Sequence, residues 1–168
     1  MFGPVPILNH AAGEYPRRYL FTKGMSFLAA EYTAIFVQQV AAGQNVAFTE
    51  TAVPGSNCIN HREGSGIITL RGMTNQCFAR FKVVFGGNIS IPTGGTVGPI
   101  SIAIAIEGEA LGSATATVTP AAVGDEFNVF AEALIAVPRG CCVSVSVKNP
   151  NTQAIEVQNG NVIIERIS

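Results

Sequence analysis

The sequence is poor in charged side chains, and this shortage limits the classes of protein to which it can belong. Asp, Glu, Lys and Arg make up 12% of the 168 residues, against about 25% in ordinary soluble domains. Hydrophobic residues make up 48%. Such a chain is expected to span a membrane, to be a secreted disulfide scaffold, or to hide much of its surface in an assembly.

The pattern of the long uncharged segment argues against a membrane span. The longest run without charge, residues 83–106, contains Gly and Pro and alternates in its second half, so it cannot form one continuous spanning helix. The N-terminus lacks a basic stretch followed by an apolar core, so no signal peptide is predicted. We therefore expect no membrane insertion.

The chain also lacks the basic clusters that nucleic-acid-binding proteins carry. Its formal net charge is −1, and Arg17-Arg18 is its one pair of adjacent cations. Because affinity for nucleic acid comes largely from Lys and Arg on phosphates, a nucleic-acid partner is not expected.

Side chains suited to catalysis or metal binding are few. There are two histidines, His10 and His61, and one aspartate, Asp125. A triad using His61 and Asp125 would need a presented serine, and no Gly-x-Ser-x-Gly motif occurs. Glu107 and Glu109 flank a turn and could bind calcium, although a solvated hairpin tip is the preferred interpretation. We expect no enzyme activity, no cofactor and no metal.

Four cysteines are too few for a disulfide-dense scaffold. Cys141 and Cys142 are adjacent and would point to opposite faces of a strand, and the Cys-x₂₋₄-Cys spacing of zinc sites is absent. Small buried thiols are the preferred interpretation, while a Cys58–Cys77 bridge or a bond between subunits stays open. Assembly is thus the leading explanation for the shortage of charge.

From about Tyr32 onward the chain reads as short strands separated by Gly, Pro and Asn, which predicts an all-β antiparallel sandwich or jelly roll. Residues 25–37 have some helical spacing, but their β-favouring side chains predict a strand from Tyr32. A loop is predicted over residues 86–98. The predicted strands are 31–40, 45–50, 67–70, 76–86, 98–109, 110–120, 126–138, 140–149, 154–158 and 161–167.

The strand in residues 98–109 has branched apolar residues on one face and small uncharged ones on the other. A strand face in contact with water normally carries larger polar or charged residues. Small side chains let another sheet approach closely without desolvating a charge. We therefore predict that Ser101, Ala103 and Ala105 face a neighbouring subunit in a closed oligomer. A neutral face exposed to solvent is the alternative.

Residues 1–30 differ from the rest and are predicted to form an extended N-terminal arm that precedes a domain of residues 31–168. They show no periodicity and contain three of the nine prolines. We expect the arm to dock on a neighbouring protein, with an acidic patch of a shell subunit as its target. A solvated segment is the alternative. The predicted docking residues are Tyr15, Arg17, Arg18, Tyr19 and Phe21.

Five segments resemble the trimeric jelly-roll domains related to tumour necrosis factor and the complement collagen-like heads. They are YTAIFVQQVAAGQNVAFTE, then HREGSGIITLRG, and then the late strands TPAAVGDEFNV, VPRGCCVSVSV and NVIIERI. The greatest likeness is to the bacterial branch, which caps collagen-like spore-surface proteins of Firmicutes and occurs in their bacteriophages. The resemblance spans residues 31–168.

The resemblance implies a homotrimer and does not imply catalysis. Because no Gly-x-y collagen run precedes the domain, a head on a short arm is favoured over a stalked filament. The preferred interpretation is a structural protein on the exterior of a phage capsid, a decoration or head-fibre protein bound to the shell through residues 1–30. It would be made in the bacterial cytoplasm and located on the virion surface.

Two alternatives place the same trimer elsewhere. It could be a receptor- or glycan-binding tip of a phage tail or bacterial surface, or a component of a spore surface. A host-surface glycan usually binds to an exposed aromatic platform, and the chain has no Trp and three Tyr. The scarcity of these residues favours the structural role.

Overall fold

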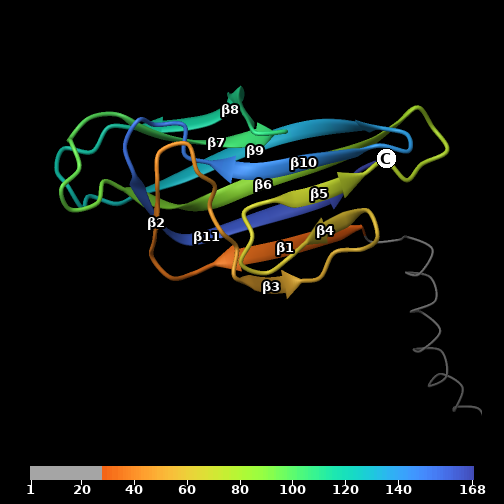
Figure 1. Ribbon diagram of the computed structural model, residues 1–168, viewed down its shortest axis with the longest axis horizontal. Helices are drawn as coiled ribbons and strands as arrows, with labels where there is room; N and C mark the ends of the chain where they lie inside the picture. Colours follow the sequence, from red (N-terminus) through yellow and green to blue (C-terminus); the bar gives the residue numbers. More distant parts are fainter. Residues whose placement is uncertain (1–27) are drawn as a thin grey trace, which may run out of the picture.

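The computed structural model describes residues 28–168, which form two antiparallel β-sheets packed face to face (Figure 1). The expected all-β antiparallel sandwich is confirmed. The strands are β1 (Ala29–Ala34), β2 (Gln38–Val40), β3 (Glu50–Val53), β4 (Ile59–His61), β5 (Ile68–Arg71), β6 (Phe78–Ser90), β7 (Ile100–Ile106), β8 (Glu109–Val118), β9 (Phe127–Pro138), β10 (Cys142–Lys148) and β11 (Ile155–Arg166).

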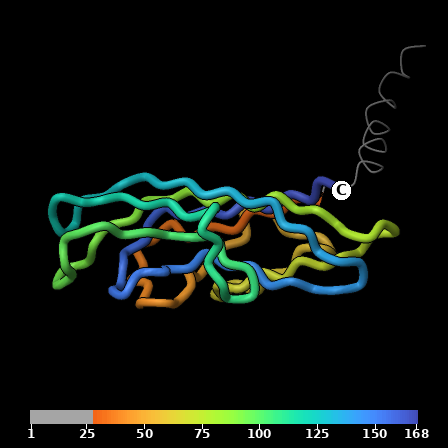
Figure 2. Tube along the Cα trace, turned by 90° about the horizontal axis from the view of Figure 1, so that it is seen from above, coloured from red at the N-terminus to blue at the C-terminus, as the bar shows by residue number. Residues whose placement is uncertain are grey.

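The six-stranded sheet has the order β3-β1-β11-β6-β9, and β2 pairs with β11. The five-stranded sheet has the order β4-β5-β10-β7-β8. Most strands run along the long axis of the molecule, so the loops gather at its two ends (Figures 1 and 2). The described residues contain no helix long and apolar enough to cross a membrane.

Alternating side chains from both sheets fill the space between them. On β6 the predicted apolar face is confirmed, since Ala79, Phe81, Val83 and Phe85 are fully buried. The isoleucines of β7 at positions 100, 102 and 104 are buried in the same core from the opposite sheet. This arrangement follows from the two-residue period of a strand, which sends every second side chain to one face.

The first strand is confirmed over a helix, but it is interrupted. β1 ends at Ala34, and residues 35–37 separate it from β2, where one strand was expected over residues 31–40. The interruption lies opposite an irregularity in β11, where Asn159 has a positive φ of 53° and donates its backbone N–H to the Ile35 carbonyl. The β-favouring side chains of Ile35, Phe36 and Val37 are consequently exposed.

The segment predicted as a strand over residues 45–50 instead bridges the two sheets. Its Val46 N–H donates to the Val147 carbonyl, and its Phe48 N–H donates to the Ser65 carbonyl. Both side chains are fully buried. The segment is extended and apolar as expected, but its hydrogen bonds go to different partners, so no continuous ladder forms before β3.

Two other boundaries differ from the prediction. β6 continues to Ser90, into residues expected to form a loop, because Ile89 and Ile91 are buried. Residues 154–158 and 161–167, expected as two strands, lie largely in the single strand β11, which passes through its irregularity without ending.

The start of the described part lies beside the end of β11. The Arg166 N–H donates to the Leu28 carbonyl, and Leu28 packs against the core. β1 begins at Ala29, so the sheet includes the last two residues of the segment predicted as an arm. The described part of the chain therefore begins at the end of the sandwich where β11 finishes.

A close backbone approach fixes the turn between β9 and β10 against the loop that follows β5. A Cβ added at Gly72 would lie 2.1 Å from the Pro138 carbonyl oxygen. The Gly72 N–H donates to the Cys141 carbonyl, and the Gly72 carbonyl accepts from the Gly140 N–H. Only a residue without a Cβ fits this site.

We expect Gly72→Ala to lower the free energy of unfolding by about 2–3 kcal/mol, because backbone must move to accommodate the methyl group. Gly112→Ala is the matched control, since a Cβ at Gly112 would have no neighbour within 4 Å. Urea denaturation of both variants measures the difference. Equal stability of the two variants would contradict the assigned packing.

Candidate functional site

The outer face of the six-stranded sheet carries large apolar side chains that the core does not use. Phe130 and Leu134 of β9 are 60% and 69% exposed. Both alternate with inward-facing residues of the same strand, so they point away from the core. We name the four outward-facing residues Val84, Phe130, Leu134 and Ile163 the apolar patch.

The register across three strands brings the members of the patch together. Val84 of β6 lies directly opposite Ile163 of β11, and on its other side opposite Glu132 of β9, between Phe130 and Leu134. Phe130 lies opposite Gly86, which has no side chain to cover the ring. The patch therefore spans β11, β6 and β9, the last of which is an edge strand of the sheet.

Some of the charged groups around the patch are paired within the chain, whereas Glu165, two residues after Ile163 on the same face, is exposed and makes no ion pair among the described residues. Lys82 Nζ lies 3.7 Å from Glu132 Oε2, and Asn161 Nδ2 donates to Glu31 Oε1 at 3.0 Å. Paired groups lose less on desolvation than isolated charges do. An apolar face whose polar border is partly satisfied within the chain is suited to contact with another protein surface.

The opposite outer face corrects the predicted contact between subunits. Ala103 and Ala105 are fully buried in a single chain although they do not belong to the core, and Ser101 alone of the three is partly exposed. Lys148 lies opposite Ala103 and its Nζ donates to the Gly108 carbonyl at 2.7 Å, so its stem covers the alanines. The two alanines thus have no surface to offer a partner.

The structure does not test the other residues that were predicted to make contacts. Ser101 Oγ and Thr117 Oγ1 share a hydrogen bond of 2.7 Å, so the partly exposed Ser101 hydroxyl is engaged within the sheet. Its contact with a neighbouring subunit stays a prediction. The predicted docking residues of the arm, Tyr15, Arg17, Arg18, Tyr19 and Phe21, lie outside the described residues.

His61 occupies a structural position at the end of β4. Its Nε2 donates to the Ser65 carbonyl at 2.9 Å, and its ring packs 4.4 Å from that of Tyr32. Its Nδ1 is buried and has no hydrogen-bond partner among the described residues. Asp125 is held in its own turn, where its carboxylate accepts from the Ala122 N–H. The structure therefore does not bring His61 and Asp125 together as a catalytic pair.

The two glutamates of the predicted hairpin tip have different surroundings. Glu107 and Gly108 both have positive φ and form the tight turn between β7 and β8. The Glu107 carboxylate accepts from the Ser144 N–H on β10. Within residues 28–168, no group of three or more His, Cys, Asp or Glu is placed to hold a metal ion.

The cysteines correct the expectation of buried thiols. All four are free, and Cys58 alone is buried, whereas Cys77, Cys141 and Cys142 are exposed. The Cys58–Cys77 bridge is therefore not formed. The exposed cysteines lie in or beside the connections at one end of the sandwich, where no core side chains cover them.

The fold is similar to solved structures of tumour necrosis factor and complement domains. Eiger TNF from S. frugiperda has a TM-score of 0.64 at 12% identity, covering 84% of this chain and 93% of that one. Murine APRIL at pH 5.0 has 0.60 at 8%, covering 84% and 100%. The globular domain of zebrafish complement 1qA protein has 0.57 at 11%, covering 83% and 94%.

These likenesses establish the fold alone. The chain has the two-sheet jelly-roll fold of tumour necrosis factor and complement C1q domains. No family model and no curated protein matches the sequence. The likeness to a bacterial and phage branch therefore stays a prediction from the sequence.

The buried Tyr32 hydroxyl gives the stability of the fold a testable pH dependence. Burial raises the pKa of Tyr32 above 10.0, against the opposing effect of a hydrogen bond with the Gly55 backbone. An unfolded tyrosine ionises near that pH, while the folded one stays neutral. The contribution of Tyr32 to the free energy of unfolding is therefore fully present below about pH 10 and is lost as the pH rises further.

We expect the free energy of unfolding to fall by up to about 1.4 kcal/mol per pH unit above about pH 10 through this group. Tyr32→Phe should flatten that decline, because phenylalanine has no proton to lose. Denaturant titrations at a series of alkaline pH values measure both chains. An identical decline in the variant would show that Tyr32 is not responsible.

Proposed function

We propose that this chain is a non-enzymatic structural module that assembles as a homotrimer through the apolar patch and is displayed on the exterior of a phage capsid. The exposure of Phe130 and Leu134 on a regular sheet face is the observation that carries the proposed assembly. Burying each such side chain contributes about 1.5–3 kcal/mol. A closed trimer has three such contacts, so this burial free energy is gained at each of them.

The threefold arrangement rests on the fold and on symmetry. The jelly-roll fold agrees with the resemblance that implies a homotrimer. A contact between unlike surfaces closes into a ring when the rotation between copies is the correct fraction of a turn, and otherwise continues as a filament. A ring of three leaves no apolar patch uncovered.

The polar residues of the described part support a role without catalysis. His61 is engaged with the Ser65 carbonyl and stacked on Tyr32, so it is positioned by packing rather than presented to a substrate. Burial in the core raises the pKa of Tyr32, so this effect also comes from packing.

The position of residue 28 supports attachment through the preceding segment. Leu28 joins the sandwich at the end where β11 finishes, opposite the loops of residues 91–99 and 119–126. A shell contact made through residues 1–27 would therefore present the opposite end to the surroundings. The resemblance to phage head proteins supports a phage capsid as the shell.

The alternative role as a glycan-binding tip has weaker support in the exposed loops. A depression of about 290 Å³ lies between residues 92–96 and Gln153. The Gln153 amide already accepts from the Thr96 N–H at 2.8 Å and donates to the Thr96 carbonyl at 2.9 Å. Its hydrogen-bonding capacity is thus directed to the loop itself.

The assembly is tested by mass and by substitution of the patch. Three copies of 17.5 kDa should give about 52 kDa in light scattering. Leu134→Glu should reduce the mass to that of one copy, because three carboxylates would be desolvated in the trimer. Val97→Glu is the control, since Val97 is an exposed apolar residue in a loop at one end. A monodisperse monomer of the unaltered chain would refute the assembly.

Attachment is tested by removing residues 1–27 and leaving Leu28, which packs against the core. The shortened chain should remain a trimer, of correspondingly lower mass, and should keep its β-sheet circular dichroism but lose incorporation into particles. Particles assembled with the full and the shortened chains, compared by gel densitometry, measure the loss. Undiminished incorporation would transfer the attachment to the jelly roll.

A further inference from the structure

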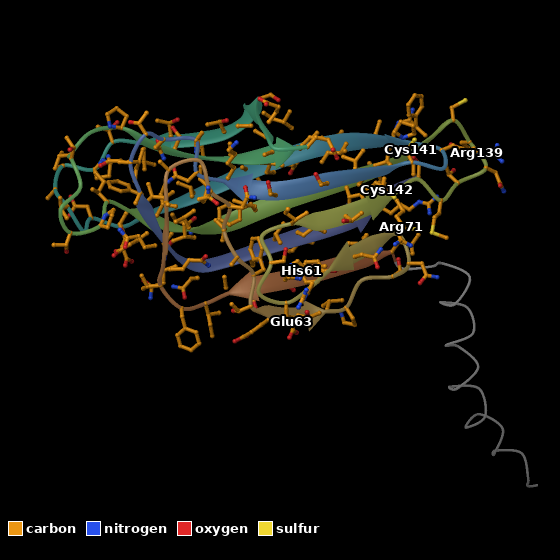
Figure 3. All side chains as sticks on the ribbon, in the orientation of Figure 1. His61, Glu63, Arg71, Arg139, Cys141 and Cys142 are labelled. Carbon is orange, nitrogen blue, oxygen red and sulfur yellow. The ribbon has the colours of Figure 1, made fainter. Side chains whose placement is uncertain are left out.

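Three arginines from separate segments meet at the end of the sandwich where β11 finishes. Arg139 lies in the turn between β9 and β10, and the next residue, Gly140, donates its N–H to the Gly72 carbonyl at 3.0 Å. Gly72 directly follows Arg71, the last residue of β5. Figure 3 shows Arg71 and Arg139 at this same end of the molecule.

The third arginine is joined to the first two through Cys58. The Arg71 N–H donates to the Cys58 carbonyl at 2.8 Å, and Arg166 Nη1 lies 3.3 Å from Cys58 Sγ. Arg166 Nε also donates to the Ser168 carbonyl at 2.9 Å. The backbone of three strands and two loops thus fixes the positions from which these cations extend.

A pocket of about 600 Å³ opens between these segments. It is lined by residues 72–75 and by Arg139, Gly140 and Arg166. Its volume lies within the range of about 300–1,000 Å³ that is typical of ligand sites. The pocket is open to solvent, so a segment of another protein can enter it without displacing the core.

The lining of the pocket carries cations and no acidic side chain, and Glu165, which precedes Arg166 in β11, lies outside that lining. No Asp or Glu lines the pocket, and none occurs in residues 72–79 or 136–143. Across residues 28–168, the one ion pair between side chains is Lys82–Glu132, so Arg71 and Arg139 are not paired. Unpaired guanidinium groups around a concave surface attract anions and bind carboxylates through two parallel hydrogen bonds.

We propose that this pocket, with Arg139 and Arg166 in its wall and Arg71 at its edge, binds an acidic peptide segment of a partner protein. A carboxylate matches the guanidinium fork of Arg139, which no other group of the described chain occupies. A glycan would be expected to stack on an aromatic ring, and none lines the pocket. A nucleic acid would require a longer basic track than three residues provide.

The pocket lies at the end where Leu28 joins the sandwich, which is the end turned toward the shell in the proposed function. That the acidic segment belongs to the shell protein rests on that proposed function. The binding itself rests only on the geometry of the pocket. The two inferences can therefore fail separately.

The test measures the fluorescence anisotropy of a labelled peptide of about six glutamates with the full-length chain under reducing conditions. We expect Arg139→Glu to weaken binding at least about tenfold, because it replaces an attraction by a repulsion. Arg139→Gln should lose less, and Arg71→Gln combined with it should lose more. Added salt should weaken the binding of the unaltered chain.

Arg62→Glu is the matched control, because Arg62 is an exposed arginine outside this pocket, and its substitution makes the same change in net charge. It should keep the affinity within about twofold. Arg17, Arg18 and Lys23 are present in every variant, so their attraction for the peptide cancels in the comparison.

The proposal is overturned by absent peptide binding, by equal losses in the Arg62 and Arg139 variants, or by a sulfated oligosaccharide that binds more tightly with the same dependence on Arg139. Light scattering of each variant reports the assembly independently. A monomeric chain that binds the peptide through Arg139 would refute the proposed trimer and keep this inference. A trimer that does not bind the peptide would refute this inference and keep the proposed trimer.

Discussion

The alternation of side chains along the long central strands is the constraint on which the rest of the structure depends. Once Phe81 and Phe85 of β6 and the isoleucines of β7 fill the core, the residues between them must face outward. The two outer faces then receive very different side chains. β7 presents small residues that Lys148 covers, while β9 presents Phe130 and Leu134 to solvent. Both contrasting surfaces are consequences of filling one core.

This constraint explains why the sequence predicts the sandwich well and its contacts less well. Periodicity shows which residues share a face, as it does for β6 and β7. It does not show how far a neighbouring side chain reaches. Ala103 and Ala105 were expected at a subunit contact because they are small, yet the stem of Lys148 from β10 covers them. Phe130 and Leu134 alternate visibly in the sequence, so a count of large apolar residues on the second face of β9 would have identified the apolar patch.

Other differences between the predicted and the observed strands arise where backbone hydrogen bonds do not follow a regular strand ladder. Val46 and Phe48 belong to the core, but the Val46 N–H donates to β10 whereas the Phe48 N–H donates to Ser65 in the loop between β4 and β5, which no local pattern reveals. The interruption at residues 35–37 depends on an irregularity in β11, more than 120 residues later in the chain. The arginine pocket has the same origin, because Arg71, Arg139 and Arg166 are remote in sequence and meet only when β5, β9 and β11 finish at one end.

The apolar patch and the arginine pocket lie on different surfaces, and this separation relates assembly to attachment. The patch is on the side of the sandwich, whereas the pocket is at one end of strands that run along the long axis. In a ring whose axis follows the strands, contacts through the side leave the pockets of all copies pointing in one direction. Each pocket alone would hold an acidic segment weakly. In the proposed trimer, three pockets on one rigid base would raise the effective concentration for the second and third contacts, so modest individual affinity would suffice for the proposed attachment.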